Sequence, residues 1–410
     1  MTKKYQTEAP GYTMTTVMEE AARCLLCHDA PCSQACPAHT DPAKFIRSVR
    51  FRNIKGAAET IRENNALGAI CARVCPTEKY CELACSRSGI DVPIDIGGIQ
   101  RYVTDFEQAA DMHILKKGNS NGMNVAIIGS GPSGLQAAVT LLEKGYGVDL
   151  YERQAKAGGY LTYGIPEYRL PSNIVDYEIK RITDMGANIH LNTTIGEDIT
   201  MDQLKADNDA VIVAIGASES KVLPMFENND AVETAVSFLA RTKDAQGNID
   251  LPKDAIVIGG GDVAMDVVTT LKKLGVKHVT DAAYEEFDEF RASKKELAGA
   301  EAEGVTILDG YIPDSIDGHT VTFKHRHMNS KLTIEADKII LAIGQTVNAN
   351  NLGIRLEHGE SPSAGYKTRD EKVFITGDIA QGDKTVVYAV QKGKEVADEI
   401  DSILGGNHND

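Results

Sequence analysis

The sequence predicts an α/β chain in which an all-helical, cysteine-rich N-terminal domain precedes two Rossmann-like domains, the second inserted into the first. Three observations predict this fold class. All eight cysteines of the 410 residues fall within the first 85. Two units of strand, glycine-rich loop, helix and strand begin near residues 125 and 255. Two short apolar strands that end in glycine, 211–216 and 339–344, bracket the second unit.

The cysteines form two groups of four with short spacings. The first group reads C-x2-C-x4-C-x3-C-P (Cys24, Cys27, Cys32, Cys36), and the second reads C-x3-C-P-x4-C-x3-C (Cys71, Cys75, Cys81, Cys85). Soft thiolate ligands at such spacings suit iron–sulfur clusters or zinc. A zinc ribbon would contain paired C-x2-C knuckles, and only one such knuckle is present. The pattern favours two [4Fe–4S] clusters, with zinc as the alternative.

Disulfides are the other explanation for an even number of clustered cysteines. The first 13 residues contain no apolar run, and the chain has no stretch of ~18 or more consecutive apolar residues. We therefore expect a cytoplasmic protein with no membrane segment, in a reducing compartment where clustered thiols more often bind metal. The net charge of −16 disfavours nucleic acids and anionic membranes as partners.

The prolines after Cys36 and Cys75 are typical of ferredoxin motifs, in which the last cysteine of a run ligates the other cluster. This rule predicts one cluster held by Cys24, Cys27, Cys32 and Cys85, and another held by Cys36, Cys75, Cys81 and one further ligand. On thiolate chemistry alone, Cys71 is the expected fourth ligand of the second cluster.

The first Rossmann-like unit follows a polar stretch at 116–122. The unit consists of a strand (125–128), the glycines Gly129, Gly131 and Gly134, a helix (135–144), and a strand (147–151) that ends at Glu152. Glycines at this spacing let the backbone turn tightly and approach a pyrophosphate at the helix N-terminus, and the acid can bind a ribose hydroxyl. The unit is expected to bind a dinucleotide.

The second unit repeats the pattern. It consists of a strand (255–258), a loop with Gly259, Gly261 and Ala264, a helix (265–274), and a strand (277–284) followed by Glu285 and Glu286. A carboxylate at this place accepts the ribose hydroxyls of NAD, whereas the 2′-phosphate of NADP calls for arginine. The sequence favours NADH over NADPH. The alternative is that Glu285 and Glu286 belong to a solvated acidic surface.

A chain with clusters and two such units most naturally holds FAD and NAD. Gly158 and Gly159 follow the first unit, and a strand near the C-terminus ends in Gly377 and Asp378. This pair resembles that of FAD enzymes whose aspartate holds the ribityl chain, so the first unit is assigned to FAD. The expected domains are 1–120 (helical, two clusters), 121–235 with 346–410 (FAD), and 236–345 (NAD). We assign no catalytic side chain, because no cysteine follows Cys85 to form a C-x-x-C in the inserted domain.

Over nearly its full length, the chain resembles the family of the glutamate synthase small subunit and the N-terminal half of dihydropyrimidine dehydrogenase. The resemblance rests on the cysteine array, on GIPEYRLP (164–171), on GGGDVAMD (259–266), and on Gly377 and Asp378 with TVVYAV (385–390). Within the family the chain is most similar to bacterial NAD-dependent dihydropyrimidine dehydrogenase subunits, through the segments 23–32, 64–68 and 71–78.

The resemblance implies an electron conduit from NADH through FAD and two clusters to a partner subunit. That partner would carry FMN and further clusters and reduce uracil or thymine to the 5,6-dihydropyrimidine. In dihydropyrimidine dehydrogenases a glutamine ligates a cluster although a cysteine lies at the position of Cys71, so Gln100 competes with Cys71. Thr385 would aim backbone N–H groups at the flavin, or else be an ordinary helix cap. The alternative functions are the small subunit of a glutamate synthase and a non-catalytic scaffold.

Overall fold

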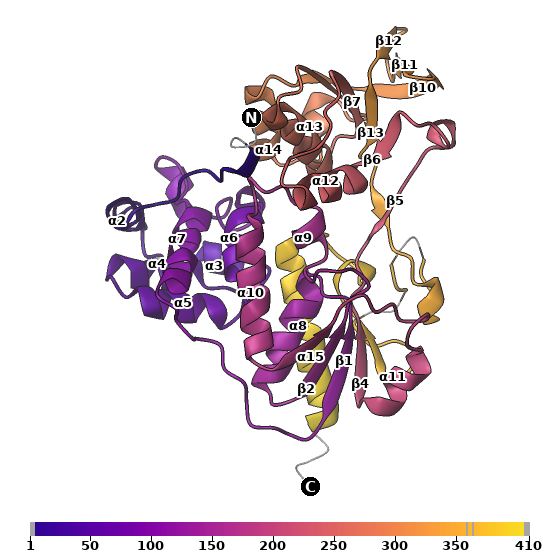
Figure 1. Cartoon of the computed structure of the whole chain (residues 1–410). Helices are drawn as coiled ribbons and strands as arrows, with labels where there is room; N and C mark the ends of the chain where they lie inside the picture. The colour runs from indigo at the N-terminus through magenta and orange to yellow at the C-terminus, as the bar shows by residue number, and fades with distance from the viewer. Residues whose placement is uncertain (1–4, 358–359, 363–364, 406–410) are drawn as a thin grey trace. The chain divides into compact units, whose positions relative to one another are not determined.

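The computed structural model describes residues 5–357, 360–362 and 365–405, and the chain divides into two compact units. The smaller unit consists of Met1–Ala9, Tyr163–Pro171 and Ser218–Thr346, and the larger unit of Pro10–Thr162, Ser172–Ala217 and Val347–Asp410. Each unit contains one five-stranded parallel sheet, and Figure 1 shows the elements along the chain.

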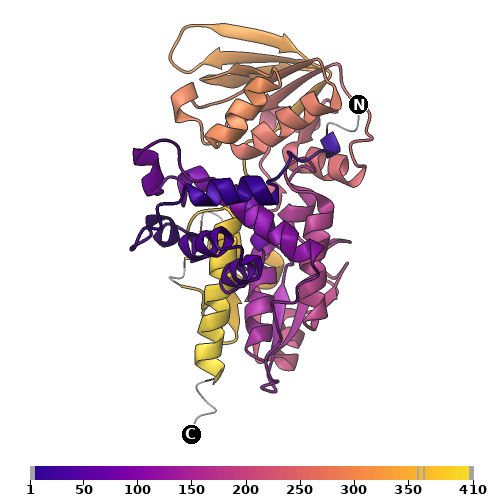
Figure 2. The same ribbon diagram turned by 90° about the vertical axis from the view of Figure 1, so that its left-hand side faces the viewer.

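The larger unit begins with a bundle of short helices. They are α2 (Met14–Ala22), α3 (Pro31–Gln34), α4 (Pro42–Arg50), α5 (Ile54–Arg62), α6 (Gly68–Val74) and α7 (Ile96–Ala109), with 3-10 turns at Thr77–Lys79 and Ser86–Gly89. Polar side chains cap four of the helices: Thr13, Asp41, Asn53 and Asp95 accept hydrogen bonds from first-turn N–H groups. Figure 2 shows these helices in indigo and violet and helix α15 in yellow, and α6 contacts α15.

The apolar faces of helices α4 and α5 form the core of this bundle. Phe45, Ile46 and Val49 of α4 pack with Ala57 and Ile61 of α5, and all five are buried. Their spacing of three and four residues places them on one face of each helix. The amphipathic stretches that the sequence shows here therefore serve the domain's own packing.

The sheet of the larger unit has the strand order β15-β4-β1-β2-β3, and all of its pairs are parallel. The strands are β1 (Asn124–Ile128), β2 (Gly147–Tyr151), β3 (Ala187–His190), β4 (Ala210–Val213) and β15 (Val373–Ile375). The helices are α8 (Pro132–Glu143), α9 (Tyr160–Tyr163), α10 (Ser172–Asp184), α11 (Met201–Asp207) and α15 (Val386–Leu404). Helix α15 packs along α8, where Gly393 allows close approach, because a Cβ there would lie 2.3 Å from the Ser133 carbonyl oxygen.

The sheet of the smaller unit has the order β6-β13-β7-β8-β9, again parallel. Its strands are β6 (Val232–Thr234), β7 (Asp254–Ile258), β8 (His278–Ala282), β9 (Thr306–Leu308) and β13 (Lys338–Leu341). Its helices are α12 (Ala235–Asp244), α13 (Asp262–Leu274) and α14 (Lys294–Ala302). An antiparallel sheet of β10 (Tyr311–Asp317), β11 (Thr320–His325) and β12 (Lys331–Glu335), and a pair of β5 (Glu219–Ser220) with β14 (Gln345–Thr346), complete it.

These two parallel sheets confirm the predicted fold class. Each has the order of a Rossmann-like sheet, and the strands of the second sheet lie in the sequence between β4 and β15 of the first. Both nucleotide-type helices begin three residues earlier than the sequence indicates, at Pro132 and Asp262. Gly131 and Gly261 are the N-caps, so the remaining loop residues already form the first turn. The exact domain boundaries stay a prediction.

No helix in the described part of the chain is both long and apolar enough to span a membrane.

A short segment, Tyr163–Pro171, belongs to the smaller unit although the chain on both sides of it belongs to the larger one. Arg169 Nη1 lies 2.7 Å from both carboxylate oxygens of Asp266, and Arg169 Nε lies 3.2 Å from Glu296 Oε1. Lys243 Nζ donates to two carbonyl oxygens of the segment at 2.7 and 3.1 Å. These buried ionic contacts fix the segment to α12, α13 and α14.

Replacing Arg169 by Met is expected to loosen this segment, because it leaves two carboxylates in a buried site without their cation. The free energy of unfolding is expected to fall by roughly 3–5 kcal/mol. Burial raises the pKa of Asp266 to about 7 even with Arg169 present. Protonation neutralises Asp266 at lower pH, so Arg169→Met should lose more stability above pH 7 than below it.

Hydrogen exchange of peptides from the smaller unit measures this change directly. The control is Lys331→Met, because the Lys331 side chain is exposed and its ion pair with Asp314 should contribute at most about 1 kcal/mol. Equal hydrogen exchange in the two variants would contradict the claim that the Arg169 ion pairs stabilise the smaller unit more than the exposed Lys331 pair does.

Candidate functional site

Four cysteines from two distant parts of the sequence line one pocket in the helical bundle. Cys24, Cys27 and Cys32 lie around α3, and Cys85 comes just before the turn Ser86–Gly89. The other lining residues are Leu25, Ala30, Pro31, Ala43, Ile46, Ser86, Arg87, Ile94 and Ile96. The structure thus brings together the four thiols that the ferredoxin rule assigns to one cluster, in a largely apolar setting.

The other four cysteines form a second, more buried group. The Cys75 thiol lies close enough to Cys71, Cys81 and Cys36 for these three groups to raise its pKa, in addition to the larger effect of burial. Burial also raises the pKa of Cys71 to about 12 and that of Cys32, in the first group, to about 11. Thiolates in such places need a compensating cation, which the irons of a cluster would supply.

A cluster and a single metal ion require different arrangements of the thiols. Among the residues that the structure describes, no three His, Cys, Asp or Glu side chains converge closely enough to hold one metal ion. A single zinc would require four sulfurs about 2.3 Å from one centre. In a [4Fe–4S] cluster each thiolate binds a different iron, so the sulfurs are spread further apart.

Both candidates for the fourth ligand of the second group lie near the start of α6. Cys71 is in this helix, 3% exposed, close to the Cys36 and Cys75 thiols. Gln100 of α7 donates through Nε2 to the carbonyl oxygen of Gly68, at 2.8 Å. That hydrogen bond uses the amide nitrogen, so the amide oxygen is the atom that could bind iron. The choice between Cys71 and Gln100 stays open.

The first glycine loop has the shape of a phosphate cradle. Gly129 has φ +104°, and a Cβ there would lie 2.5 Å from the Ala214 carbonyl oxygen. A Cβ on Gly134 would lie 2.1 Å from the Gly129 carbonyl oxygen. A Cβ on Gly131, by contrast, would meet no atom within 4 Å. The outer glycines thus permit close packing, and the middle one leaves open space at the N-terminus of α8.

The predicted partners of this loop surround it. Glu152 is buried, and its Oε2 accepts hydrogen bonds from Ser130 N at 3.1 Å and Ser130 Oγ at 2.6 Å. Gly159 has φ +54°, and a Cβ there would lie 3.0 Å from the Gly131 Cα atom. Gly129, Gly131, Glu152 and Gly159 therefore form one site.

Three further residues of the predicted flavin site, Gly377, Asp378 and Thr385, lie in the C-terminal part of the larger unit. We call them the flavin wall. Gly377 has φ +73°, and Asp378 Oδ2 accepts from Ala217 N at 3.4 Å. Thr385 is the N-cap of the 19-residue helix α15. Buried Lys392 donates through Nζ to the carbonyl oxygens of Gly377 and Ala380, at 3.2 Å each. No sequence motif points to Lys392, because its role depends on a tertiary contact.

Tyr80 connects the second cysteine group to this wall. It precedes Cys81 in the chain, and its hydroxyl donates to Asp383 Oδ2 at 2.6 Å. The centres of the Tyr80 and Tyr388 rings are 5.8 Å apart. Sequence reasoning missed Tyr80, although its position beside a cysteine was visible.

In the smaller unit the second glycine loop repeats the same geometry. A Cβ on Gly259 would lie 2.4 Å from the Ala342 carbonyl oxygen, whereas one on Gly261 would meet no atom within 4 Å. Ala264 is fully buried in the first turn of α13. Glu285 lies against the loop, because a Cβ on Gly260 would be 2.6 Å from Glu285 Oε2. Glu285 therefore lies beside the glycine loop, and its role as a ribose acceptor stays a prediction.

One arginine lies beside Glu285 and another beside the preceding residue, Tyr284, although the sequence suggested neither. Arg291 Nε is 3.2 Å from Glu285 Oε1, and the Arg291 side chain is exposed. The guanidinium carbon of Arg326 lies 4.1 Å from the centre of the Tyr284 ring, and Arg326 Nη1 donates to the Tyr284 carbonyl oxygen at 3.0 Å. Arg326 follows β11, so only the folded chain brings it here. In the folded chain, two basic side chains therefore accompany the acidic residues of this segment.

Family models cover most of the chain. Residues 1–112 match the model described as "Dihydroprymidine dehydrogenase domain II, 4Fe-4S cluster", and residues 123–393 match "Pyridine nucleotide-disulphide oxidoreductase". The NAD-dependent dihydropyrimidine dehydrogenase subunit PreT of Escherichia coli O157:H7 is 56% identical over 97% of this chain and 96% of its own. The chain belongs to the PreT family.

More distant relatives agree with this assignment. The glutamate synthase [NADPH] small chain of Escherichia coli K12 is 32% identical over 93% of this chain and 90% of its own. Among solved structures, Mycobacterium tuberculosis FprA has a TM-score of 0.59 at 18% identity, covering 69% of this chain and 85% of its own. Thermoplasma acidophilum thioredoxin reductase has 0.57 at 19%, covering 69% and 98%. These two structures bear on the fold alone.

The matches confirm that the chain is an oxidoreductase and confirm the cofactor classes that the sequence predicts, namely [4Fe–4S], FAD and NAD. The PreT-family assignment also agrees with the resemblance found in the sequence. The ligands of each cofactor stay predictions.

Replacing Cys85 by Ser is expected to remove one cluster and about half of the bound iron, because Cys85 lines the pocket with Cys24, Cys27 and Cys32. Iron per flavin in anaerobically purified protein is the measurement. The matched control is Ser86→Ala, the next residue on the same pocket wall, which should keep all of the iron. Unchanged iron in the Cys85 variant would refute the crossed ligand assignment.

Proposed function

We propose that the chain is the NADH-oxidising flavin and iron–sulfur subunit of a dihydropyrimidine dehydrogenase. Its electrons would pass to a partner subunit that carries FMN and further clusters and reduces uracil or thymine to the 5,6-dihydropyrimidine. The observation that carries this proposal is the 56% identity to PreT over 97% of the chain, with the eight cysteines and both glycine loops in place. When bound, NADH supplies a hydride, FAD divides its two electrons, and the clusters carry them singly.

The larger unit would hold FAD through its glycine loop and the wall at Gly377. Backbone N–H groups at the start of α8 bind the pyrophosphate, and Glu152 accepts a ribose hydroxyl. Asp378 holds the ribityl chain, and Lys392 fixes the loop that carries Asp378. The N-terminus of α15, capped by Thr385, stabilises negative charge on the reduced ring.

The two cysteine groups would hold two [4Fe–4S] clusters: Cys24, Cys27, Cys32 and Cys85 one, and Cys36, Cys75, Cys81 with Cys71 or Gln100 the other. The second group is the one that the protein connects to the flavin wall. Tyr80, next to Cys81, contacts Asp383 and Tyr388 at the start of α15. This packing supports transfer between the flavin and the second cluster, because the residue next to Cys81 contacts the segment at the start of α15.

Glu285 would select NADH in the smaller unit. Its carboxylate lies against the Gly260 backbone, where it can accept the ribose hydroxyls and repel a 2′-phosphate. The loop of Gly259, Gly261 and Ala264 binds the pyrophosphate at the start of α13.

A hetero-oligomer in the cytoplasm is the assembly that we propose, because the PreT relatives are named as subunits of a dehydrogenase. The alternative, a glutamate synthase small subunit, has weaker support, with 32% identity against 56%. A non-catalytic scaffold would not need eight cysteines and two open glycine loops. We therefore keep it only as an outcome of the test.

The deciding experiment is NADH oxidation by the complex captured anaerobically with this chain. Uracil-dependent oxidation is the expected result. Activity only with 2-oxoglutarate plus glutamine would assign the chain to glutamate synthase. A colourless protein without flavin or iron would support the scaffold.

Replacing Glu285 by Ser is expected to raise the affinity for NADPH roughly tenfold, about 1.4 kcal/mol. The change removes the acid that faces the loop and releases Arg291, whose guanidinium can bind the 2′-phosphate. The change in affinity is measured from the rate of flavin reduction at a range of NADH or NADPH concentrations. Flavin absorbance follows this rate.

Glu286→Ser is the matched control, because Glu286 is adjacent but more exposed and lies near His327. It should leave the preference for NADH within about twofold of its original value. If both variants changed the preference equally, the acidic surface as a whole, and not Glu285, would set it.

A further inference from the structure

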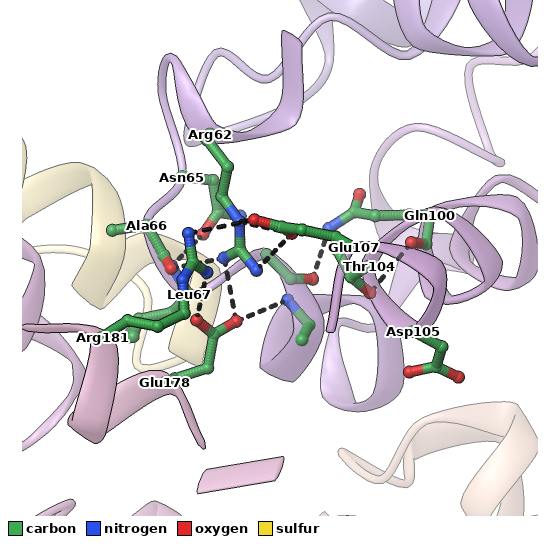
Figure 3. Close-up of polar contacts among 12 residues, drawn as sticks. Arg62, Asn65, Ala66, Leu67, Gln100, Thr104, Asp105, Glu107, Glu178 and Arg181 are labelled. Carbon is green, nitrogen blue, oxygen red and sulfur yellow. Dashed lines mark hydrogen bonds and ion pairs between the residues drawn. The ribbon is translucent and has the colours of Figure 1, made fainter. Parts of the chain in front are cut away.

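Four buried, charged side chains connect the cysteine-containing helices to the helix α10 beside the first sheet. Arg62 of α5 lies 2.8 Å from Glu107 of α7 and 2.8 Å from Glu178 of α10. Arg181 of α10 lies 3.0 Å from Glu107 and 2.9 Å from Glu178. Figure 3 shows the four groups in alternation, each carboxylate between two guanidinium groups. We call these residues the charge tetrad.

Burial makes the tetrad costly. The side chains of Arg62 and Glu107 are 0% exposed, that of Glu178 is 1% exposed, and that of Arg181 is 11% exposed. Removing an ion from water costs several kcal/mol, and apolar residues of similar size would often be at least as stable. Two positive and two negative charges balance, so the tetrad as a whole is neutral. Stability alone is a weak reason for such an arrangement.

The tetrad also reaches the helix that contains cysteines of the second group. Glu178 Oε1 accepts a hydrogen bond from Ala69 N in the first turn of α6, at 3.1 Å. Arg62 Nη1 donates to the Ala66 carbonyl oxygen at 2.5 Å. Cys71 lies two residues after Ala69, and Cys75 is the C-cap of α6. Figure 3 shows these contacts converging on the start of α6, with Gln100 nearby.

The charges of the tetrad lie beside the cysteine site. Glu178 contacts Ala69 and Arg62 contacts Ala66, at the start of the helix that contains Cys71. In a low-dielectric interior, a single unbalanced charge at this range is far stronger than at the surface. A cluster gains one negative charge when it is reduced. Its reduction potential would therefore change if the tetrad gained or lost net charge.

We propose that the charge tetrad sets the reduction potential of the cluster at the second cysteine group, by keeping balanced charge beside α6. This inference rests on the proposed function, because it assumes an electron-carrying cluster there. Neutralising Glu107 leaves two guanidinium groups sharing one carboxylate, Glu178. Because a guanidinium cannot lose its proton, the tetrad then carries one net positive charge, which favours the reduced cluster. Neutralising Glu107 and Arg181 together restores the balance.

The test is a redox titration of the whole chain, purified anaerobically with its cofactors and followed by electron paramagnetic resonance. In Glu107→Gln, the ratio of reduced to oxidised second cluster at a fixed potential should rise roughly tenfold. The double variant Glu107→Gln with Arg181→Gln should return to within about twofold of the original ratio. The cluster of the first group is an internal reference and should shift less.

The exposed control is Glu59→Gln on α5, whose side chain is 54% exposed and pairs with Lys55. It should not change either cluster. No shift in Glu107→Gln, or a double variant further from the original than the single one, would overturn the proposal, because a merely structural role makes damage accumulate.

If Glu107→Gln loses the second cluster, the iron content of the single variant is compared with that of the double variant. The balanced double variant should then retain the cluster, and loss from both variants would overturn the proposal. The titration needs neither uracil nor the partner. A missing dehydrogenase activity, which would contradict the proposed function, therefore stays distinguishable from a missing shift.

Discussion

The structure of the helical bundle depends on bringing Cys85 back to Cys24, Cys27 and Cys32. These thiols line one pocket, and three of them pack against the same apolar core as α4, α5 and α7. The bundle has a core of its own, but a centre bound by four thiolates would add cross-links that apolar packing alone does not provide. We therefore expect cluster binding and folding of this region to be coupled.

The second cysteine group has a different role because it adjoins the rest of the larger unit. On one side, Tyr80 contacts the start of α15. On the other, the charge tetrad and Ala69 connect α6 to α10. The first group faces a pocket within the bundle, whereas the second is packed against the proposed flavin site. This difference suggests an order for the two clusters, with the second nearer to the flavin.

Local patterns in the sequence were sufficient for the fold class, the glycine loops and the grouping of the thiols. Glycine spacing and strand periodicity act over a few residues, and in both loops a Cβ on the middle glycine, Gly131 or Gly261, would meet no atom within 4 Å. The tetrad was not predictable in this way, because Arg62 and Glu178 are 116 residues apart and each alone reads as a surface charge. The same holds for Lys392 and Arg326, whose partners become neighbours only after folding.

The most direct test of the account is rapid anaerobic mixing of the isolated chain with NADH, without any partner. Flavin absorbance and the paramagnetic signals of the clusters would be followed together. We expect NADH to bleach the flavin and both clusters then to be reduced within the same chain. Reduction of the flavin with the clusters left oxidised, even though their own titration shows that NADH could reduce them, would contradict the electron conduit.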